Sequence, residues 1–175
     1  MRIKELKVDC EDSFNIQLAN EDDEVSLQRI CNEWIEKSFF ENDMLAYDHI
    51  RQCLLYGDLP PIKHATKENY ALYAVRLGGE IVGLFDLYDG YPLDNTAWIS
   101  LFLLDIPIRG RGFGQRIENE IACFCRANGF QSLALALSMN NRQAFKFWVS
   151  CGYKEILGLY GDIKFPVIGL KKSLK

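Results

Sequence analysis

The centre of this chain constrains its fold most strongly, because an apolar run, a glycine-rich turn and an amphipathic helix follow one another there. The run at residues 97–104 is too continuously apolar for a half-exposed strand, so we expect it in the middle of a sheet. The turn contains Gly110, Gly112 and Gly114, and the helix is predicted at residues 114–127. A buried strand leading into a helix through a tight turn indicates an α/β or mixed α+β fold.

The first part of the chain reads as one strand followed by two helices. Period-two alternation at residues 14–18 predicts the strand. Asn20 is a good helix cap, and the acidic residues after it suit the positive end of a helix dipole. A second helix is predicted at residues 44–55, before Gly57. The apolar residues at helical spacing in the first helix are Leu27, Ile30, Cys31, Trp34 and Ile35.

The remaining patterns complete a mixed sheet. Residues 70–77 and 80–87 flank Gly78-Gly79 and read as a hairpin. Residues 132–137 predict another buried strand and residues 141–150 a short helix, followed by strands near residues 153–159 and 165–170. We therefore expect a central mixed sheet of about six to seven strands with helices on both faces. At this length, residues 1–175 are expected to form a single domain.

Charge and cysteine content exclude several classes of function. A net charge of -4 and a pI near 5.3 argue against a nucleic-acid partner. No apolar run reaches the length of a membrane span, and the N-terminus lacks a signal core, so we expect no membrane partner and a cytoplasmic protein. The six scattered cysteines form no Cys-x-x-Cys pair, and with only two histidines we expect reduced thiols and no metal site.

The glycine turn is a candidate anion site. A strand–turn–helix junction exposes unpaired backbone N–H groups at the positive end of a helix dipole, and Arg109 and Arg111 add positive charge. A phosphate or pyrophosphate is the natural ligand, whereas the simpler alternative is a turn with two solvated arginines. A dinucleotide fingerprint would need glycine where Gln115 stands, and no Walker Gly-Lys-Ser/Thr follows.

The turn resembles the acetyl-CoA signature of the GNAT (Gcn5-related) N-acetyltransferases, Arg/Gln-x-x-Gly-x-Gly/Ala, at Arg109, Gly112 and Gly114. A second motif of that family also matches, at Asn141, Ala144, Phe147, Trp148, Gly152 and Tyr153. The resemblance implies a GNAT-like fold and direct transfer of an acetyl group from acetyl-CoA, as cosubstrate, to an amine of a small molecule or protein. A non-catalytic acyl-CoA-binding or sensor protein on the same fold is the alternative.

The resemblance also implies which residues bind acetyl-CoA. Main-chain groups of Phe102, Leu103 and Leu104 would lie along pantetheine. The pyrophosphate would lie on Arg109, Gly110, Arg111, Gly112, Phe113 and Gly114. Asn141 would contact the pantetheine arm, although it also suits a helix cap. Ala144 and Phe147 would be cofactor-binding residues or simply part of the core.

The catalytic groups depart from the family pattern. Relatives often place Tyr where Trp148 stands, and an indole is no useful acid, so Trp148 is expected to shape the thiol pocket. This leaves Cys151, Tyr153 or Tyr160 as alternative donors. Relatives often carry a Glu on the strand at residues 97–104, where Ser100 is the only polar side chain in this sequence. The Ser100 hydroxyl would either orient a water molecule or simply form a hydrogen bond within the core.

The acceptor site has several candidate segments. Loop residues Asp86, Tyr88, Asp89, Tyr91 and Asp94 would line its mouth or simply be solvated. The connection at residues 39–43 is another candidate, because relatives commonly use that region. The acceptor itself, the acyl chain length and the oligomeric state are not readable from the sequence, and a homodimer stays open.

Overall fold

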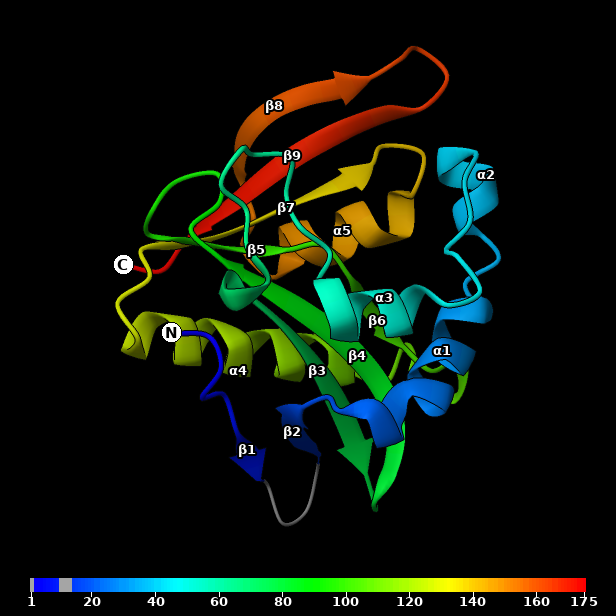
Figure 1. The fold of residues 1–175 in the computed structure, drawn as a ribbon. Helices are drawn as coiled ribbons and strands as arrows, with labels where there is room; N and C mark the ends of the chain where they lie inside the picture. Colours follow the sequence, from blue (N-terminus) through cyan, green and yellow to red (C-terminus); the bar gives the residue numbers. More distant parts are fainter. Residues whose placement is uncertain (1, 10–13) are drawn as a thin grey trace.

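The computed structural model describes residues 2–9 and 14–175, and in these residues the strands form one mixed nine-stranded sheet. The strand order is β1-β2-β3-β4-β5-β7-β9-β8, with β6 paired to β4 (Figure 1). Only the β5–β7 pair is parallel among these described pairings. The mixed α/β architecture is confirmed, with more strands than the six to seven expected.

The strands are β1 (Val8–Asp9), β2 (Asn15–Leu18), β3 (Tyr70–Leu77), β4 (Glu80–Asp89), β5 (Thr96–Ile99), β6 (Phe102–Leu104), β7 (Ser132–Ser138), β8 (Glu155–Gly161) and β9 (Pro166–Ser173). The α-helices are α1 (Glu24–Asn32), α2 (Lys37–Glu41), α3 (His49–Tyr56), α4 (Phe113–Ala127) and α5 (Arg142–Ser150). Short 3-10 turns lie at η1 (Glu21–Asp23), η2 (Lys67–Asn69) and η3 (Ile106–Ile108).

Helices cover both faces of the sheet, as expected (Figure 1). On one face, α4 packs Ile117 and Ile121 into a core that also holds Trp148 of α5. On the other, α1 and α3 pack against the alternate residues of the same strands, so that Leu84 faces α1 and α3 while Phe85 faces α4 and α5. No helix among the described residues is long and apolar enough to cross a membrane.

The first helix begins where the capping signal predicts but ends earlier than expected. The Asn20 side chain accepts from the Asp22 N–H at 2.8 Å, and Asp23 accepts from the Asn20 N–H at 3.1 Å, which forms a capping box around η1. Helix α1 follows and ends at Asn32. Trp34 and Ile35 therefore lie beyond it, and Ile35 is exposed.

The predicted helix at residues 44–55 is wrong at its start, because α3 begins only at His49 and a short helix, α2, precedes it. The reason is a tertiary contact. The Gln28 side chain of α1 accepts from the Ile50 N–H at 2.9 Å and donates to the Ala46 carbonyl at 3.1 Å. This amide holds the chain before α3 in a non-helical path, which no local pattern reveals.

The cysteines of the described residues carry free thiols. Cys31, Cys53 and Cys125 are buried, whereas Cys123 is exposed on α4. Cys10 lies outside the described residues.

Candidate active site

The apolar run at residues 97–104 is divided between β5 and β6, so the expectation of one continuous strand is wrong. The Asp86 carboxylate of β4 causes the break, because its Oδ1 accepts from the backbone N–H groups of Ser100 at 2.8 Å and Leu101 at 2.9 Å. The Asp86 side chain thus accepts the hydrogen bonds that a neighbouring strand would otherwise accept from Ser100 and Leu101. Beyond the break, β6 pairs with β4, whereas β5 pairs with β7.

The break turns main-chain groups of β6 away from the sheet. Asp86 donates its N–H to the Leu101 carbonyl at 3.1 Å, and the register continues through the Leu84–Leu103 pair. Antiparallel pairs alternate between hydrogen-bonded and open residues, so the Leu103 main chain faces β4 while that of Phe102 and Leu104 faces outward. The outward edge is the gap between β6 and β7.

The glycine turn leads directly into α4. Gly110 and Gly112 have positive φ angles of 72° and 83°, and Gly112 is the N-cap residue of the helix. A Cβ added at either position would meet nothing within 4 Å, so both backbones border open space. Gly114 differs, because its Cβ would lie 3.1 Å from the Phe147 ring. The α4 N-terminus therefore presents first-turn N–H groups to an open surface beside α5.

A groove of about 420 Å³ runs between the glycine turn, β6 and α5; we name it the glycine groove. Of the residues expected at a CoA site, it brings together Phe102, Leu103, Leu104, Arg109, Gly110, Gly112, Gly114, Asn141, Ala144, Phe147 and Trp148. Arg111 and Phe113 are not among its lining residues: Arg111 is exposed, and Phe113 packs against the core. The Arg109 Nε donates to the Leu104 carbonyl at 2.7 Å, which holds this guanidinium beside β6.

At the α5 end of the groove, Asn141 caps the helix and Trp148 closes the floor. The Asn141 Oδ1 accepts from the Ala144 N–H at 3.0 Å, as the capping alternative expects. Trp148 is only 6% exposed and packs edge-on against Phe102, Phe147 and Tyr153. Its indole is held as a rigid wall.

A second space, of about 470 Å³, adjoins the glycine groove; we name it the polar cavity. Its polar lining includes Lys37, Glu41, Asp43, His49, Asp58, Ser100 and Ser138. Trp34, Phe102, Leu103, Asn141, Ala144 and Trp148 line both spaces. Ser100 is exposed and lines this cavity, so its hydroxyl is not buried in the core. The expected acceptor region at residues 39–43 contributes Glu41 and Asp43.

The charges of the polar cavity are partly neutralised by an internal cluster. The buried Lys37 ammonium lies 2.9 Å from both the Glu41 and Asp43 carboxylates. Burial disfavours its charge, yet the hydrogen bonds from the two carboxylates outweigh that cost and raise the Lys37 pKa. Burial also raises the pKa of the Asp58 carboxyl. Asp58 has no ion pair among the residues of the described chain.

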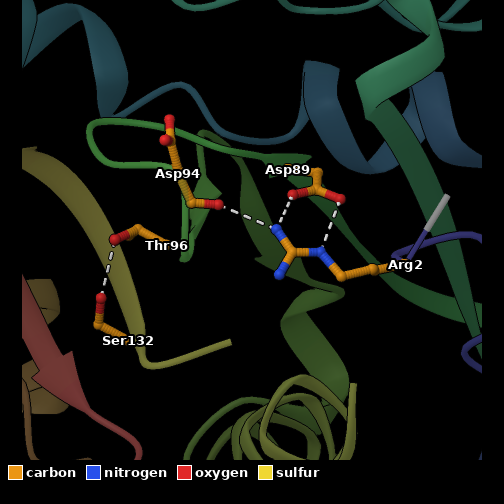
Figure 2. Close-up of polar contacts among 5 residues, drawn as sticks. All are labelled: Arg2, Asp89, Asp94, Thr96 and Ser132. Carbon is orange, nitrogen blue, oxygen red and sulfur yellow. Dashed lines mark hydrogen bonds and ion pairs between the residues drawn. The ribbon is translucent and has the colours of Figure 1, made fainter. Parts of the chain in front are cut away.

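The carboxylates of Asp89 and Asp94 lie apart from both spaces. The Arg2 guanidinium donates two hydrogen bonds to the Asp89 carboxylate, at 2.5 and 3.2 Å, and a third to the Asp94 carbonyl at 2.9 Å (Figure 2). Neither aspartate lines the glycine groove or the polar cavity. Asp86 is not in a loop at all: it is 1% exposed within β4, and burial raises its pKa to about 7 against its backbone hydrogen bonds.

The mixed sheet, the glycine turn at the start of α4 and the two adjoining spaces make up the candidate site. Residues 27–153 match the model of the acetyltransferase (GNAT) family, so the chain belongs to that family. It is therefore an acetyltransferase whose acyl donor is acetyl-CoA.

Solved structures share the fold at low sequence identity. An acetyltransferase from Thermus thermophilus is 21% identical over 92% of this chain and 97% of its own, with a TM-score of 0.67. Ribosomal-protein-alanine N-acetyltransferase from Brucella melitensis is 16% identical over 90% and 98%, with a TM-score of 0.66. A protein from Bacillus anthracis str. Ames in complex with acetyl coenzyme A is 22% identical over 60% and 62%, with a TM-score of 0.54. No curated protein matches the sequence.

Proposed function

We propose that this chain is a single-domain N-acetyltransferase that transfers the acetyl group directly to an amine, of a small molecule or a protein, within a ternary complex. Acetyl-CoA would lie in the glycine groove and the amine in the polar cavity. The observation that carries the proposal is the wall that the two spaces share. Because Phe102, Leu103 and Trp148 line both, a thioester at this wall can be reached from the cavity without passing through solvent.

The glycine groove suits acetyl-CoA along its whole length. The N–H groups at the start of α4 and the Arg109 guanidinium are donors for a pyrophosphate. The outward main chain of Phe102 and Leu104 offers an extended strand edge to the amide groups of pantetheine. Phe147 packs beside Gly114, whereas Asn141 and Trp148 line both spaces, so the thioester arm would approach Trp148 where the groove adjoins the polar cavity.

Residues at the shared wall and next to it would contribute to acyl transfer. Acetyl-CoA supplies an acetyl group that is already activated as a thioester. An outward N–H of β6 can donate to the carbonyl oxygen as negative charge builds on it. Ser100 can orient a water or the amine from the cavity side. Trp148 shapes the thiol pocket and cannot protonate the sulfur, so the CoA thiolate, a fairly stable anion, leaves without an acid from this position.

Calorimetric titration with acetyl-CoA, followed by a thiol-release assay across a panel of amines, tests the function. We expect binding together with turnover of at least one amine. Binding without turnover across the panel would favour the acyl-CoA sensor, an alternative motivated by the absence of the usual Tyr and Glu. No binding would contradict both.

Two substitutions at Asn141 distinguish its role as the cap of α5 from its proposed contact with acetyl-CoA. Asn141→Ala removes the acceptor for the Ala144 N–H and should cost about 1 kcal/mol of stability. Asn141→Asp keeps a capping oxygen but loses the amide donor, so it should retain the melting temperature while raising the Kd for acetyl-CoA about tenfold, the free energy of one lost hydrogen bond. Thermal melts and calorimetry on both variants measure the two effects. An Asp variant with unchanged affinity would contradict the pantetheine contact.

A further inference from the structure

His49 lines the polar cavity together with Ser100 and Trp148. It is the first residue of α3 and reaches the cavity from the face of the sheet opposite α4 and α5. We propose that His49 accepts the proton that the acceptor amine loses when it attacks the thioester. This inference rests on the proposed N-acetyltransferase function and names the residue that replaces the missing strand carboxylate.

A neighbouring thiol orients the imidazole. The His49 Nε2 lies 3.5 Å from the Cys53 Sγ, one helical turn along α3. Burial raises the pKa of Cys53 to about 12, so the sulfur stays a neutral thiol. When Nε2–H donates to this sulfur, the proton of the neutral imidazole is on Nε2 and the lone pair is on Nδ1. In that tautomer, Nδ1 is the atom that takes up a proton.

Burial keeps this imidazole neutral, and the neighbouring carboxylates leave it able to accept a proton. Burial lowers the His49 pKa below its ordinary value of 6.5; Asp58 and Asp48 oppose this, and Lys37 adds to it. Glu41 and Asp43, which also line the cavity, are held by Lys37. At neutral pH the ring is therefore unprotonated, and Asp58 stabilises the imidazolium that forms on proton uptake.

The other polar groups of the cavity are less suited to this step. Lys37 is protonated and paired with two carboxylates, so it has no free lone pair. The pKa of Asp43 is held below its ordinary value by Lys37, which makes it a weak base. The Ser100 hydroxyl can form a hydrogen bond but is not basic enough to take up a proton at neutral pH. The role of Asp58 in this step is to stabilise the protonated form of His49.

The step balances with these residues and water alone. The amine lone pair forms the nitrogen–carbon bond, and the carbon–sulfur bond breaks with its electron pair left on sulfur. The nitrogen becomes acidic as its lone pair is shared, so even an imidazole of lowered pKa can take its proton. His49 then returns that proton to water, and the CoA thiolate is protonated from solvent. The products are the N-acetyl amide and CoA.

His49→Gln tests this role, with the exposed His64→Gln as the matched control. In the thiol-release assay at pH 7, we expect H49Q to lower kcat about 100-fold, as typical for loss of a general base, with the acetyl-CoA KM unchanged. The wild-type rate per unprotonated amine should fall as the pH drops through the His49 pKa, and this acidic limb should be missing in H49Q and retained in H64Q. Asp58→Asn should move the limb to lower pH without removing it.

The outcomes separate the two proposals. A wild-type enzyme that is active on an amine, and whose acidic limb persists in H49Q, would overturn the role of His49 alone. No turnover by the wild-type enzyme across the panel would overturn the transferase proposal and the role of His49 with it. If H49Q does not fold, the wild-type protein still gives an answer by histidine NMR. A turned-over amine should shift the His49 imidazole signals but not those of His64, and unmoved His49 signals would overturn the role.

Discussion

Gly112→Asp should raise the Kd for acetyl-CoA about 100-fold, whereas Gly112→Asn should raise it far less. Gly112 caps α4 with a φ angle of 83° and borders open space, so both side chains fit sterically. Asn and Asp have almost the same shape and tolerate this left-handed backbone similarly well. The variants differ only in a negative charge placed where the pyrophosphate is proposed to lie, and a 100-fold change corresponds to about 2.7 kcal/mol.

The unliganded proteins provide the control for this comparison. An Asp at the N-cap accepts from first-turn N–H groups and complements the helix dipole, so G112D should melt no lower than G112N. A loss of affinity without a loss of stability would then report on the anion site rather than on folding. Calorimetry and thermal melts on the pair measure both quantities. Equal acetyl-CoA affinities for the two variants would show that the phosphates lie elsewhere.

The elements that could be predicted from the sequence are those whose signals are local. The hairpin at residues 70–87 follows from a glycine pair between alternating strands, and β3 and β4 flank those glycines as expected. Helix α4 follows from its apolar spacing and its terminal glycines. The glycine groove is also largely accessible to prediction, because two motifs with fixed spacing specify its two ends.

The errors share a different cause, namely side chains that act on distant backbone. Asp86 divides β5 from β6 although it precedes Ser100 by fourteen positions, and its role depends on which strands become neighbours. Gln28 sets the start of α3 from another helix. No local pattern in the sequence marks His49 as a site residue, because only the packing of α3 against the sheet brings it to the cavity that Ser100 also lines. Such contacts depend on tertiary structure and leave no periodicity in the sequence.

Asp86→Leu should destabilise the fold and slow acetyl transfer together. The substitution leaves the Ser100 and Leu101 N–H groups without their acceptor at the point where β6 diverges from β5. An unsatisfied buried donor costs about 1–3 kcal/mol, so we expect the free energy of unfolding at pH 5 to fall by about 2–4 kcal/mol. The same loss frees β6 to shift, and a shift of about 1 Å at a reacting centre can reduce kcat about 100-fold.

Asp86→Asn is the matched variant, since its amide oxygen can still accept both N–H groups while the ionisable group is removed. Burial raises the Asp86 pKa from 3.8 to about 7, so between these values the folded state holds a proton that the unfolded state has released. The wild-type free energy of unfolding should therefore fall as the pH rises through this window, by on the order of 3 kcal/mol. In D86N this slope should be missing, which makes the variant more stable than wild type above pH 7.

Denaturant titrations of wild type, D86N and D86L at pH 5 and pH 8, with thiol release measured alongside, distinguish the two roles of this carboxyl. If Asp86 serves to hold the β5–β6 break, D86N keeps turnover while D86L loses it at both pH values. If the ionised carboxylate itself were required for transfer, D86N would lose turnover while remaining folded. A D86L protein with wild-type stability at pH 5 and wild-type kcat would show that the break forms without the side chain, and that the divergence of β6 arises from the packing of Leu101 and Leu103 against α1 and α3 instead.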